Sequence, residues 1–247
     1  MSELEEAIER VIAGPERKSR VMSEAEKEIT AYHEGGHALV GYALPNADPI
    51  HKVSIIPRGR AGGYTLALPL EDRFYKRRSE MVDELAMLLG GRTAEELIFV
   101  DPTTGASNDI EKATQIARKM VMEYGMSDKL GPLQYGKPDG EVFLGRDYSR
   151  TQDFSNEVAA AVDDEIRVLI TQAHTEARAI LETHVDALHR VAEALKDKES
   201  LGADEVREIF HDVPKWQHDE NGTIRIKAPE SVRTIQSAVA ARTDGVT

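Results

Sequence analysis

The segment His33-Glu34-Gly35-Gly36-His37 constrains the fold of this chain more than any other, because its two histidines stand four residues apart. In an α-helix, side chains with this spacing lie on one face, with Cβ atoms about 5–6 Å apart, so both imidazoles can reach one metal ion. The spacing therefore predicts a helix here. The two glycines oppose that prediction, because each costs about 0.5–1 kcal/mol relative to alanine in a helix.

The residue types of this segment favour a zinc site that activates water. Zinc takes neutral imidazoles as ligands and lowers the pKa of a bound water, and a carboxylate beside the first ligand can accept the proton that this water loses. His-Glu-x-x-His on a helix is the pattern of metalloproteases. The alternative is a pair of solvated histidines on a surface helix. We favour the metal site because buried His and Glu side chains need partners, and apolar residues surround the motif: Ala31, Tyr32, Ala38, Leu39 and Val40.

A catalytic zinc ion takes three protein ligands and leaves one position for water, so a third ligand is required. The chain has no cysteine, which excludes thiolate ligands and disulfides. The remaining candidates are Glu95, Glu96, Asp101 and Asp109, and spacing does not choose among them. Asp109 has another explanation as a carboxylate stabilised at a helix start, and the two glutamates have another as residues on a helix surface.

Length and charge limit the class of protein. A chain of 247 residues can bury a sizeable core in one or two domains. The charged fraction of 30% and the mean hydropathy of −0.43 predict a soluble globular chain. The formal net charge of −13 argues against nucleic acid as a partner, because binding to phosphates needs a basic surface. The sequence contains no apolar run of the length that a membrane helix requires, and no signal-peptide pattern.

Periodicity predicts a mainly α-helical fold with one small β element. Ser23 and Glu26 form a capping-box pattern that opens the helix of the motif, and Pro45 ends it. Residues 51–68 alternate as in a hairpin or short sheet. Further helices are predicted over 78–98, interrupted at Gly90-Gly91, over about 108–125, over 153–196 with a break near 183–184, and over 203–210. Residues 1–12 show helical periodicity, and residues 215–247 lack any sustained period.

Several segments, taken together, resemble a known family. The segments ITAYHEGGHALVGY, HKVSIIPRGRAGGYT, GGRTAEELIF, TTGASNDIEKATQIARKMVMEYGMSDKLGPLQYG and EVFLGRDYS occur in this order between about Val11 and Val213. They resemble the peptidase domain of the FtsH family, the membrane-anchored ATP-dependent zinc proteases of bacteria and organelles. The resemblance implies a helical metalloprotease domain with a zinc helix, one small β-hairpin or edge strand, and a C-terminal helical hairpin.

The resemblance also implies roles for individual residues. His33, His37 and Asp109 would hold one Zn²⁺ per chain, and Glu34 would be the catalytic base. Glu95 matches a family glutamate near the site, which we expect to fix the tautomer of a ligand histidine, as such partners do. The chain departs from the commonest family form at Gly35, where that form has alanine.

A substrate-binding strand is implied as well, and its residues are Gly62, Gly63, Tyr64, Thr65 and Leu66. An extended polypeptide would lie along this edge strand, where main-chain hydrogen bonds bind peptides with little demand on their sequence. The implied substrates are unfolded or misfolded polypeptides, including membrane proteins. The implied activity is that of a zinc metalloendopeptidase.

The domain organisation follows from the same resemblance. Residues 1–14 would be the end of an ATPase lid helix and a hinge at Gly14, residues 15–213 the peptidase domain, and residues 214–247 a disordered tail. The chain contains no GxxxxGK[ST] phosphate loop, so ATP and Mg²⁺ are expected only in an ATPase module outside it. The family further implies a homo-hexamer at the cytoplasmic face of the bacterial cell membrane, with membrane contact only through preceding segments.

Two other functions compete with this interpretation. One is a non-catalytic module whose helices at 153–196 help to close a ring. The other is an unrelated aminopeptidase that uses Glu95 or Glu96 as its third ligand.

The two glycines of the motif carry separate expectations. Gly36 matches a glycine of the family form. We expect it to be required for close approach of neighbouring backbone, such as the loop that carries Asp109, whereas Gly35 should tolerate alanine.

Overall fold

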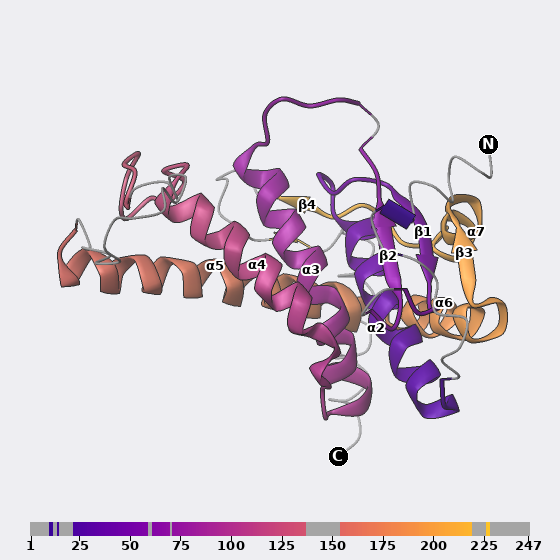
Figure 1. Ribbon diagram of the computed structural model, residues 1–247. Helices are drawn as coiled ribbons and strands as arrows, with labels where there is room; N and C mark the ends of the chain where they lie inside the picture. Colours follow the sequence, from indigo (N-terminus) through magenta and orange to yellow (C-terminus); the bar gives the residue numbers. More distant parts are fainter. Residues whose placement is uncertain are drawn as a thin grey trace, which may run out of the picture.

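The computed structural model describes residues 10–11, 14, 22–58, 61–69, 71–136, 154–218 and 226–227. Figure 1 shows how their helices and strands are arranged. The helices are α2 (Glu24–Ala43), α3 (Arg78–Phe99), the 3₁₀ turn η1 (Thr104–Ala106), α4 (Ser107–Met122), α5 (Asn156–Thr183), α6 (Val185–Lys198) and α7 (Ala203–Ile209). The strands are β1 (Ile50–Ser54), β2 (Tyr64–Ala67), β3 (Ser200–Gly202), β4 (Gln217–His218) and β5 (Ile226–Lys227). The expected fold class, mainly helical with one small sheet, is confirmed.

Helix α2 is the central helix and begins where the sequence predicts. The Ser23 hydroxyl accepts a hydrogen bond from the Glu26 amide at 3.2 Å, and the Glu26 carboxylate accepts one from the Ser23 amide at 3.1 Å. These two bonds complete the capping box and satisfy amides that the helix itself leaves unpaired. Beyond its first two turns α2 is buried, with α3 and α6 packed on it and the sheet nearby.

Helices α2 and α3 touch through their backbones. A Cβ atom built on Gly36 would lie 2.5 Å from the Gly90 carbonyl oxygen, and one built on Gly90 would lie 2.8 Å from the Gly36 carbonyl oxygen. Neither position has room for a side chain, which explains both glycines. The close approach expected at Gly36 is therefore present, but it comes from α3 and not from the loop that carries Asp109. Helix α3 also runs through Gly90 without the expected interruption, because the packing against α2 supports it.

Gly35, where we expect alanine to be tolerated, also faces a close neighbour. A Cβ atom there would lie 2.8 Å from Val191 Cγ1 on α6. The contact is with a side chain and not with backbone, so alanine at this position requires Val191 to shift. The two glycines thus differ in what they meet, and neither faces empty space.

The sheet has the strand order β2-β1-β3, and both pairings are antiparallel. In the β1–β2 pair, Val53 stands opposite Thr65, which confirms the predicted hairpin. Strand β3 was not predicted, because three residues are too few to show a period of two. Among the described strands, β2 pairs only with β1, so it forms an outer edge of the sheet.

The C-terminal helices α5 and α6 meet at His184, as predicted, but they do not form the expected hairpin. Figure 1 shows them following one another across the molecule. Helix α5 packs mainly on α3 and α4, with a smaller contact on α2, whereas α6 packs mainly on α2. The two helices touch one another only slightly, so their apolar faces are covered mainly by other helices.

The expected start of a disordered tail at residue 214 is also corrected. Trp216 is buried, its amide donates to the Ala43 carbonyl at 2.8 Å, and its indole Nε1 donates to His184 Nε2 at 3.0 Å. These contacts anchor the chain as far as strand β4, which pairs with β5. The rest of the predicted tail lies outside the described residues.

Other expectations fall outside the described residues in large part. These include the helix over residues 1–12, of which only 10–11 are described, and the segment EVFLGRDYS. Gly14 is described and has φ 84°, a conformation that suits glycine. Its role as a hinge stays a prediction. No helix in the described part of the chain is both long and apolar enough to cross a membrane.

Candidate metal centre

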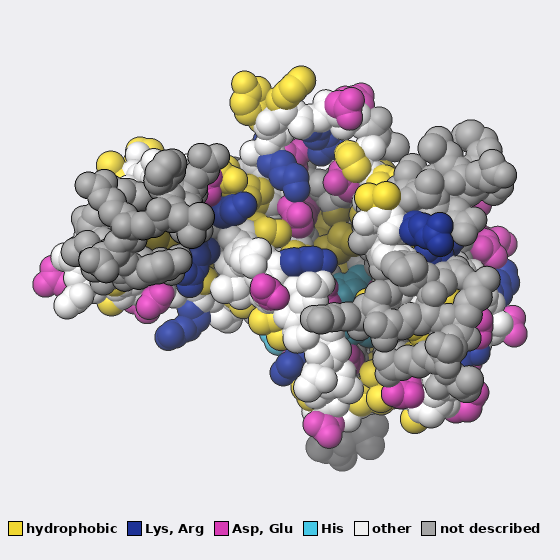
Figure 2. Space-filling model, in the orientation of Figure 1, with side chains coloured by type: hydrophobic (Ala, Val, Ile, Leu, Met, Phe, Trp, Pro, Cys, Tyr) yellow, Lys and Arg dark blue, Asp and Glu magenta, His cyan; other side chains and the backbone are white. Residues whose placement is uncertain are grey.

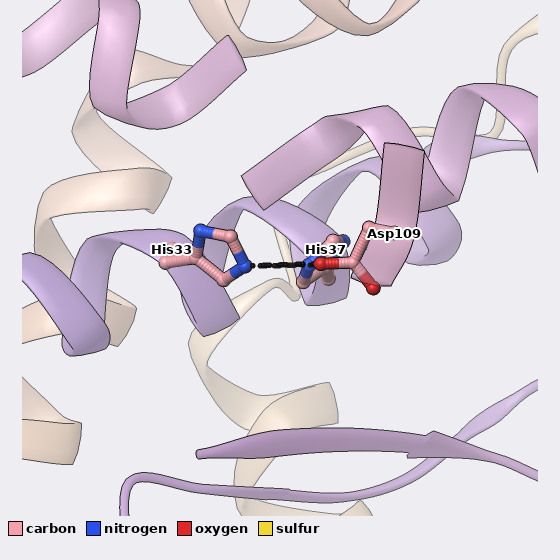
Figure 3. Close-up of side chains that lie close together, drawn as sticks. All are labelled: His33, His37 and Asp109. Carbon is pink, nitrogen blue, oxygen red and sulfur yellow. Dashed lines mark hydrogen bonds and ion pairs between the residues drawn. The ribbon is translucent and has the colours of Figure 1, made fainter. Parts of the chain in front are cut away.

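His33, His37 and Asp109 come together between α2 and the start of α4 (Figure 3). The Nε2 atoms of the two histidines are 3.1 Å apart. Asp109 Oδ2 lies 3.4 Å from His33 Nε2 and 3.5 Å from His37 Nε2. Both histidines are buried, and Asp109 is partly buried. Two imidazoles and one carboxylate that point at a common position form the donor set of a catalytic zinc site.

The other ring nitrogen of each histidine also has a partner. His33 Nδ1 donates to Glu95 Oε1 at 2.6 Å, and His37 Nδ1 donates to the Met87 carbonyl at 2.8 Å. When Nδ1 carries the hydrogen of a neutral imidazole, Nε2 presents its lone pair. Both rings are therefore fixed in the tautomer and the orientation that a metal ion requires.

Gly91 leaves the space in which an ion would sit. A Cβ atom built on Gly91 would lie 2.5 Å from His37 Nε2 and 2.6 Å from His33 Nε2. Any side chain at this position would collide with the Nε2 atoms of both imidazoles. The two glycines of α3 thus allow different contacts. Gly90 allows the close approach of α2, and Gly91 leaves room for the two imidazoles. The residues present fit a bound divalent ion.

Asp109 reaches the centre because the chain reverses sharply after α3. Helix α3 ends at Val100, which has a left-handed φ of 63°. The chain then passes through Thr103 and η1 into the first turn of α4, which carries Asp109. Glu95 Oε2 accepts a hydrogen bond from the Thr103 amide at 2.5 Å, while its other oxygen holds His33. One buried carboxylate therefore links a histidine of the centre to the loop that delivers the third residue.

The competing candidates for a third ligand point elsewhere. Glu96 accepts hydrogen bonds from Arg92 at 2.8 Å and from Arg178 at 3.2 Å, and it lies 2.9 Å from His174 Nε2. These partners place it between α3 and α5. Asp101 is exposed. Of the four carboxylates considered, Asp109 alone joins both histidines. The metal-binding role of the three residues stays a prediction.

Glu34 is held against the strand β2. Its side chain is buried, and the Thr65 hydroxyl donates to Glu34 Oε2 at 2.8 Å. A Cβ atom on Gly63 would lie 2.9 Å from both Cγ and Oε1 of Glu34, so glycine at 63 makes room for this carboxylate. Burial raises the pKa of Glu34, although the neighbouring histidines act in the opposite direction. A carboxylate with a raised pKa is better able to take up a proton near neutral pH.

The charges around the centre favour a cation. Burial opposes the charged form of His33, but hydrogen bonds to Asp109 and Glu95 outweigh it and raise the pKa of His33 to about 10. Burial also opposes the ionised form of Asp109, but its contacts with His33 and His37 hold the pKa of Asp109 well below its usual value. Three carboxylates therefore surround two imidazoles, which are neutral when they bind a metal. A divalent cation would balance this excess of negative charge.

The strand residues that the resemblance implied for substrate binding lie beside Glu34. Gly63 and Leu66 are buried, whereas Gly62, Tyr64 and Thr65 are partly exposed. In the space-filling view, histidine surface is visible in a recess near the middle of the face shown (Figure 2). A polypeptide along the outer edge of β2 would thus pass close to Glu34.

Sequence reasoning missed three features of the site: the space that Gly91 leaves, the Met87 carbonyl that orients His37, and the hydroxyl of Thr65 that holds Glu34. Gly91 had a signal, since a glycine pair inside a helical segment is costly and needs a reason. The carbonyl of Met87 had none, because any residue supplies one.

Comparison with known proteins gives a consistent result. Residues 20–209 match the model of the family described as Peptidase family M41. The chain is 58% identical over 211 residues to "ATP-dependent zinc metalloprotease FtsH 1" of Thermoanaerobacter sp. (strain X514), a match that covers 85% of this chain and 34% of the relative. It is 54% identical over 212 residues to "ATP-dependent zinc metalloprotease FtsH" of Mycobacterium tuberculosis, a match that covers 86% of this chain and 28% of the relative. The chain thus spans about one third of the length of the curated relatives that it matches.

Proposed function

Because the chain belongs to peptidase family M41, we propose that it is the zinc-dependent endopeptidase domain of an FtsH-type ATP-dependent protease. The observation that carries this proposal is the convergence of His33, His37 and Asp109 on one position, with Glu34 buried beside them. The names of the relatives support zinc as the metal, since each is called a zinc metalloprotease.

The chain's own residues supply most of the chemistry. His33, His37 and Asp109 would hold the zinc ion, and Glu95 would keep His33 in its binding tautomer. A zinc ion held there would supply Lewis-acid activation of water and of a peptide carbonyl. Glu34 would accept the proton of the attacking water and then deliver it to the departing amine, which balances the proton over the hydrolysis.

We propose that the substrate binds along the outer strand β2. An extended polypeptide would add to its free edge at Gly62 to Leu66 through main-chain hydrogen bonds, which depend little on the sequence of the polypeptide. This mode of binding suits unfolded or misfolded chains, because their backbone groups are free to pair. Folded proteins keep these groups in their own secondary structure.

The activity of the longer protein belongs to the proposal as well. The relatives are named ATP-dependent, and we infer that an ATPase module delivers unfolded substrates to this domain. We infer further a homo-hexamer at the cytoplasmic face of the bacterial cell membrane, joined to this domain through a link that ends at the hinge Gly14. In this arrangement residues 15–213 form the peptidase domain.

The substitution Glu34→Gln tests the proposal. Zinc content of the purified chain should stay at one ion per chain, while cleavage of an unfolded protein such as casein should fall by at least about 100-fold, the low end of what a general base contributes. Glu157→Gln, at an exposed position on α5, is the matched control and should keep full activity. Retained cleavage in Glu34→Gln would refute the assignment.

The same measurements separate the competing functions. A chain that binds no zinc would favour the non-catalytic ring-assembly module. A chain that removes terminal residues from short peptides but leaves casein intact would favour the aminopeptidase.

A further inference from the structure

The carboxylate of Glu34 is fixed from the side of strand β2 by one hydrogen bond. The Thr65 hydroxyl lies 2.8 Å from Glu34 Oε2 and 3.1 Å from the main-chain oxygen of the same residue. A hydroxyl has one hydrogen to donate. The carboxylate receives it, because it is the nearer acceptor and bonds to ionised acceptors are the stronger ones.

A glutamate side chain rotates about three bonds, so its helix alone does not fix the position of its oxygens. On the strand side, Gly63 lets the Glu34 side chain approach to a distance that any Cβ atom would block. Thr65 then fixes one of the two carboxylate oxygens. The described residues that touch this carboxylate through side-chain hydrogen bonds are limited to Thr65.

We propose that Thr65 is a positioning residue for Glu34, which aligns the base for proton transfer through its hydroxyl. The inference rests on the proposed peptidase function and adds to it a residue that acts through Glu34. Its side chain acts through Glu34, to whose carboxylate it donates.

The location of Thr65 gives the bond a second consequence. Thr65 belongs to β2, the outer strand, and stands opposite Val53 of β1. A substrate that adds to the free edge of β2 would hold this strand in place and thereby hold the Thr65 hydroxyl against Glu34. Substrate docking and alignment of the base therefore involve the same strand.

The test compares Thr65→Val, which keeps the shape and removes the donor, with Thr65→Ser, which keeps the donor. Thr65→Val should lower kcat for an unstructured reporter peptide by about 10- to 100-fold, the range that misplacement of a reacting group produces. KM should change by less than about 3-fold, because the proposed substrate contacts with β2 are main-chain hydrogen bonds, which this exchange leaves in place. Thr65→Ser should restore kcat to within about 3-fold of the parent. Thr175→Val, at an exposed position on α5, controls for the exchange itself and should leave both constants unchanged.

A readout without catalysis completes the test. Crystal structures of the metal-free variants should show the Glu34 side chain displaced in Thr65→Val and in place in Thr65→Ser. If Thr65→Val does not fold, as judged by circular dichroism, Thr65→Ala removes the same donor with a smaller side chain and replaces it in every measurement.

Three results would overturn the proposal: an unchanged kcat in Thr65→Val, a change confined to KM, or an equal loss of kcat in the serine variant. A failure of the proposed function is distinguishable from these, because Glu34→Gln would then also remain active.

Discussion

Glu95 and His33 share a buried hydrogen bond of 2.6 Å, from Nδ1 of the imidazole to the glutamate carboxylate. Contact with His33 offsets the effect of burial and lowers the pKa of Glu95, so the carboxylate stays ionised at neutral pH. The bond fixes the ring that presents Nε2 to the centre. The other oxygen of Glu95 holds the loop before Asp109.

From this relationship we expect Glu95→Gln to weaken zinc binding by about 10- to 100-fold, the usual cost of losing such a partner. Competition with a chromophoric chelator measures the affinity. Glu96→Gln is a matched control on the next residue, since Glu96 binds Arg92 and Arg178 away from the centre. Its zinc affinity should equal that of the parent. Equal losses in both variants would contradict the role assigned to Glu95.

Gly91→Ala should abolish zinc binding without unfolding the chain. The added methyl would lie 2.5 Å from His37 Nε2 and 2.6 Å from His33 Nε2, the two nitrogens proposed to bind the ion, while alanine favours the helix by about 1 kcal/mol. Zinc content by atomic absorption and far-UV circular dichroism report the two effects separately. Gly202→Ala is the control, because a Cβ atom there meets nothing within 4 Å. A zinc content of one per chain in Gly91→Ala would contradict the geometry.

Gly36→Ala and Gly35→Ala should both destabilise the fold, but by different amounts. Alanine at 36 pushes against the Gly90 carbonyl of α3, so a whole helix must move, and we expect a loss of about 3 kcal/mol. Alanine at 35 meets the side chain of Val191, and we expect a loss of about 1 kcal/mol. Urea unfolding measures both values. The pair Gly35→Ala and Val191→Ala should recover part of the loss at 35, which links that loss to the predicted contact.

Glu176→Gln should change how stability depends on pH. Glu176 is buried on α5, its carboxylate oxygens have no hydrogen-bond partner among the described residues, and burial together with Asp83 raises its pKa to about 8. The folded state then binds the proton more tightly than the unfolded state, whose glutamate titrates near 4.5. The stability that the proton provides is complete below pH 4.5 and is lost as pH rises to about 8, by at most about 1.4 kcal/mol per pH unit.

Glutamine does not titrate, so the variant should lack this loss. The difference in unfolding free energy, variant minus parent, should become more positive between pH 5 and pH 8.5, measured in urea. Taking the difference cancels titrations that both proteins share. A constant difference for Glu176→Gln would contradict the raised pKa.

The parts of the fold that the sequence could predict are those with local signals. The capping box of Ser23 and Glu26 placed the start of α2, and the four-residue spacing of His33 and His37 required its helical form. Strands β1 and β2 showed alternation over enough residues to be recognised. In each case the residues that decide the structure are neighbours in the chain.

The remaining features depend on contacts between distant segments. Spacing left four carboxylates as possible third ligands; only the resemblance singled out Asp109, and the fold brings Asp109 to the histidines. The hydrogen bond from Thr65 to Glu34 joins β2 to α2. The need for glycine at position 91 arises only when α3 packs against the two histidines of α2. The end-to-end arrangement of α5 and α6 depends on the helices against which they pack. Their periodicity predicts an apolar face on each helix but not its packing partner.

The order of the strands has a consequence for the time at which this domain becomes complete during synthesis. Strand β1 pairs on one side with its neighbour β2 and on the other with β3, where Lys52 stands opposite Gly202. The Ile55 amide also donates to the Glu199 carbonyl at 2.9 Å. A nascent chain that has already exposed its two histidines still lacks the flank of the sheet that supports the proposed substrate strand. Strand β3 lies at Ser200–Gly202, so more than 160 residues must follow His37 before that support can form. The three residues that we propose as metal ligands are therefore synthesised before the segment that completes the support of the proposed substrate strand.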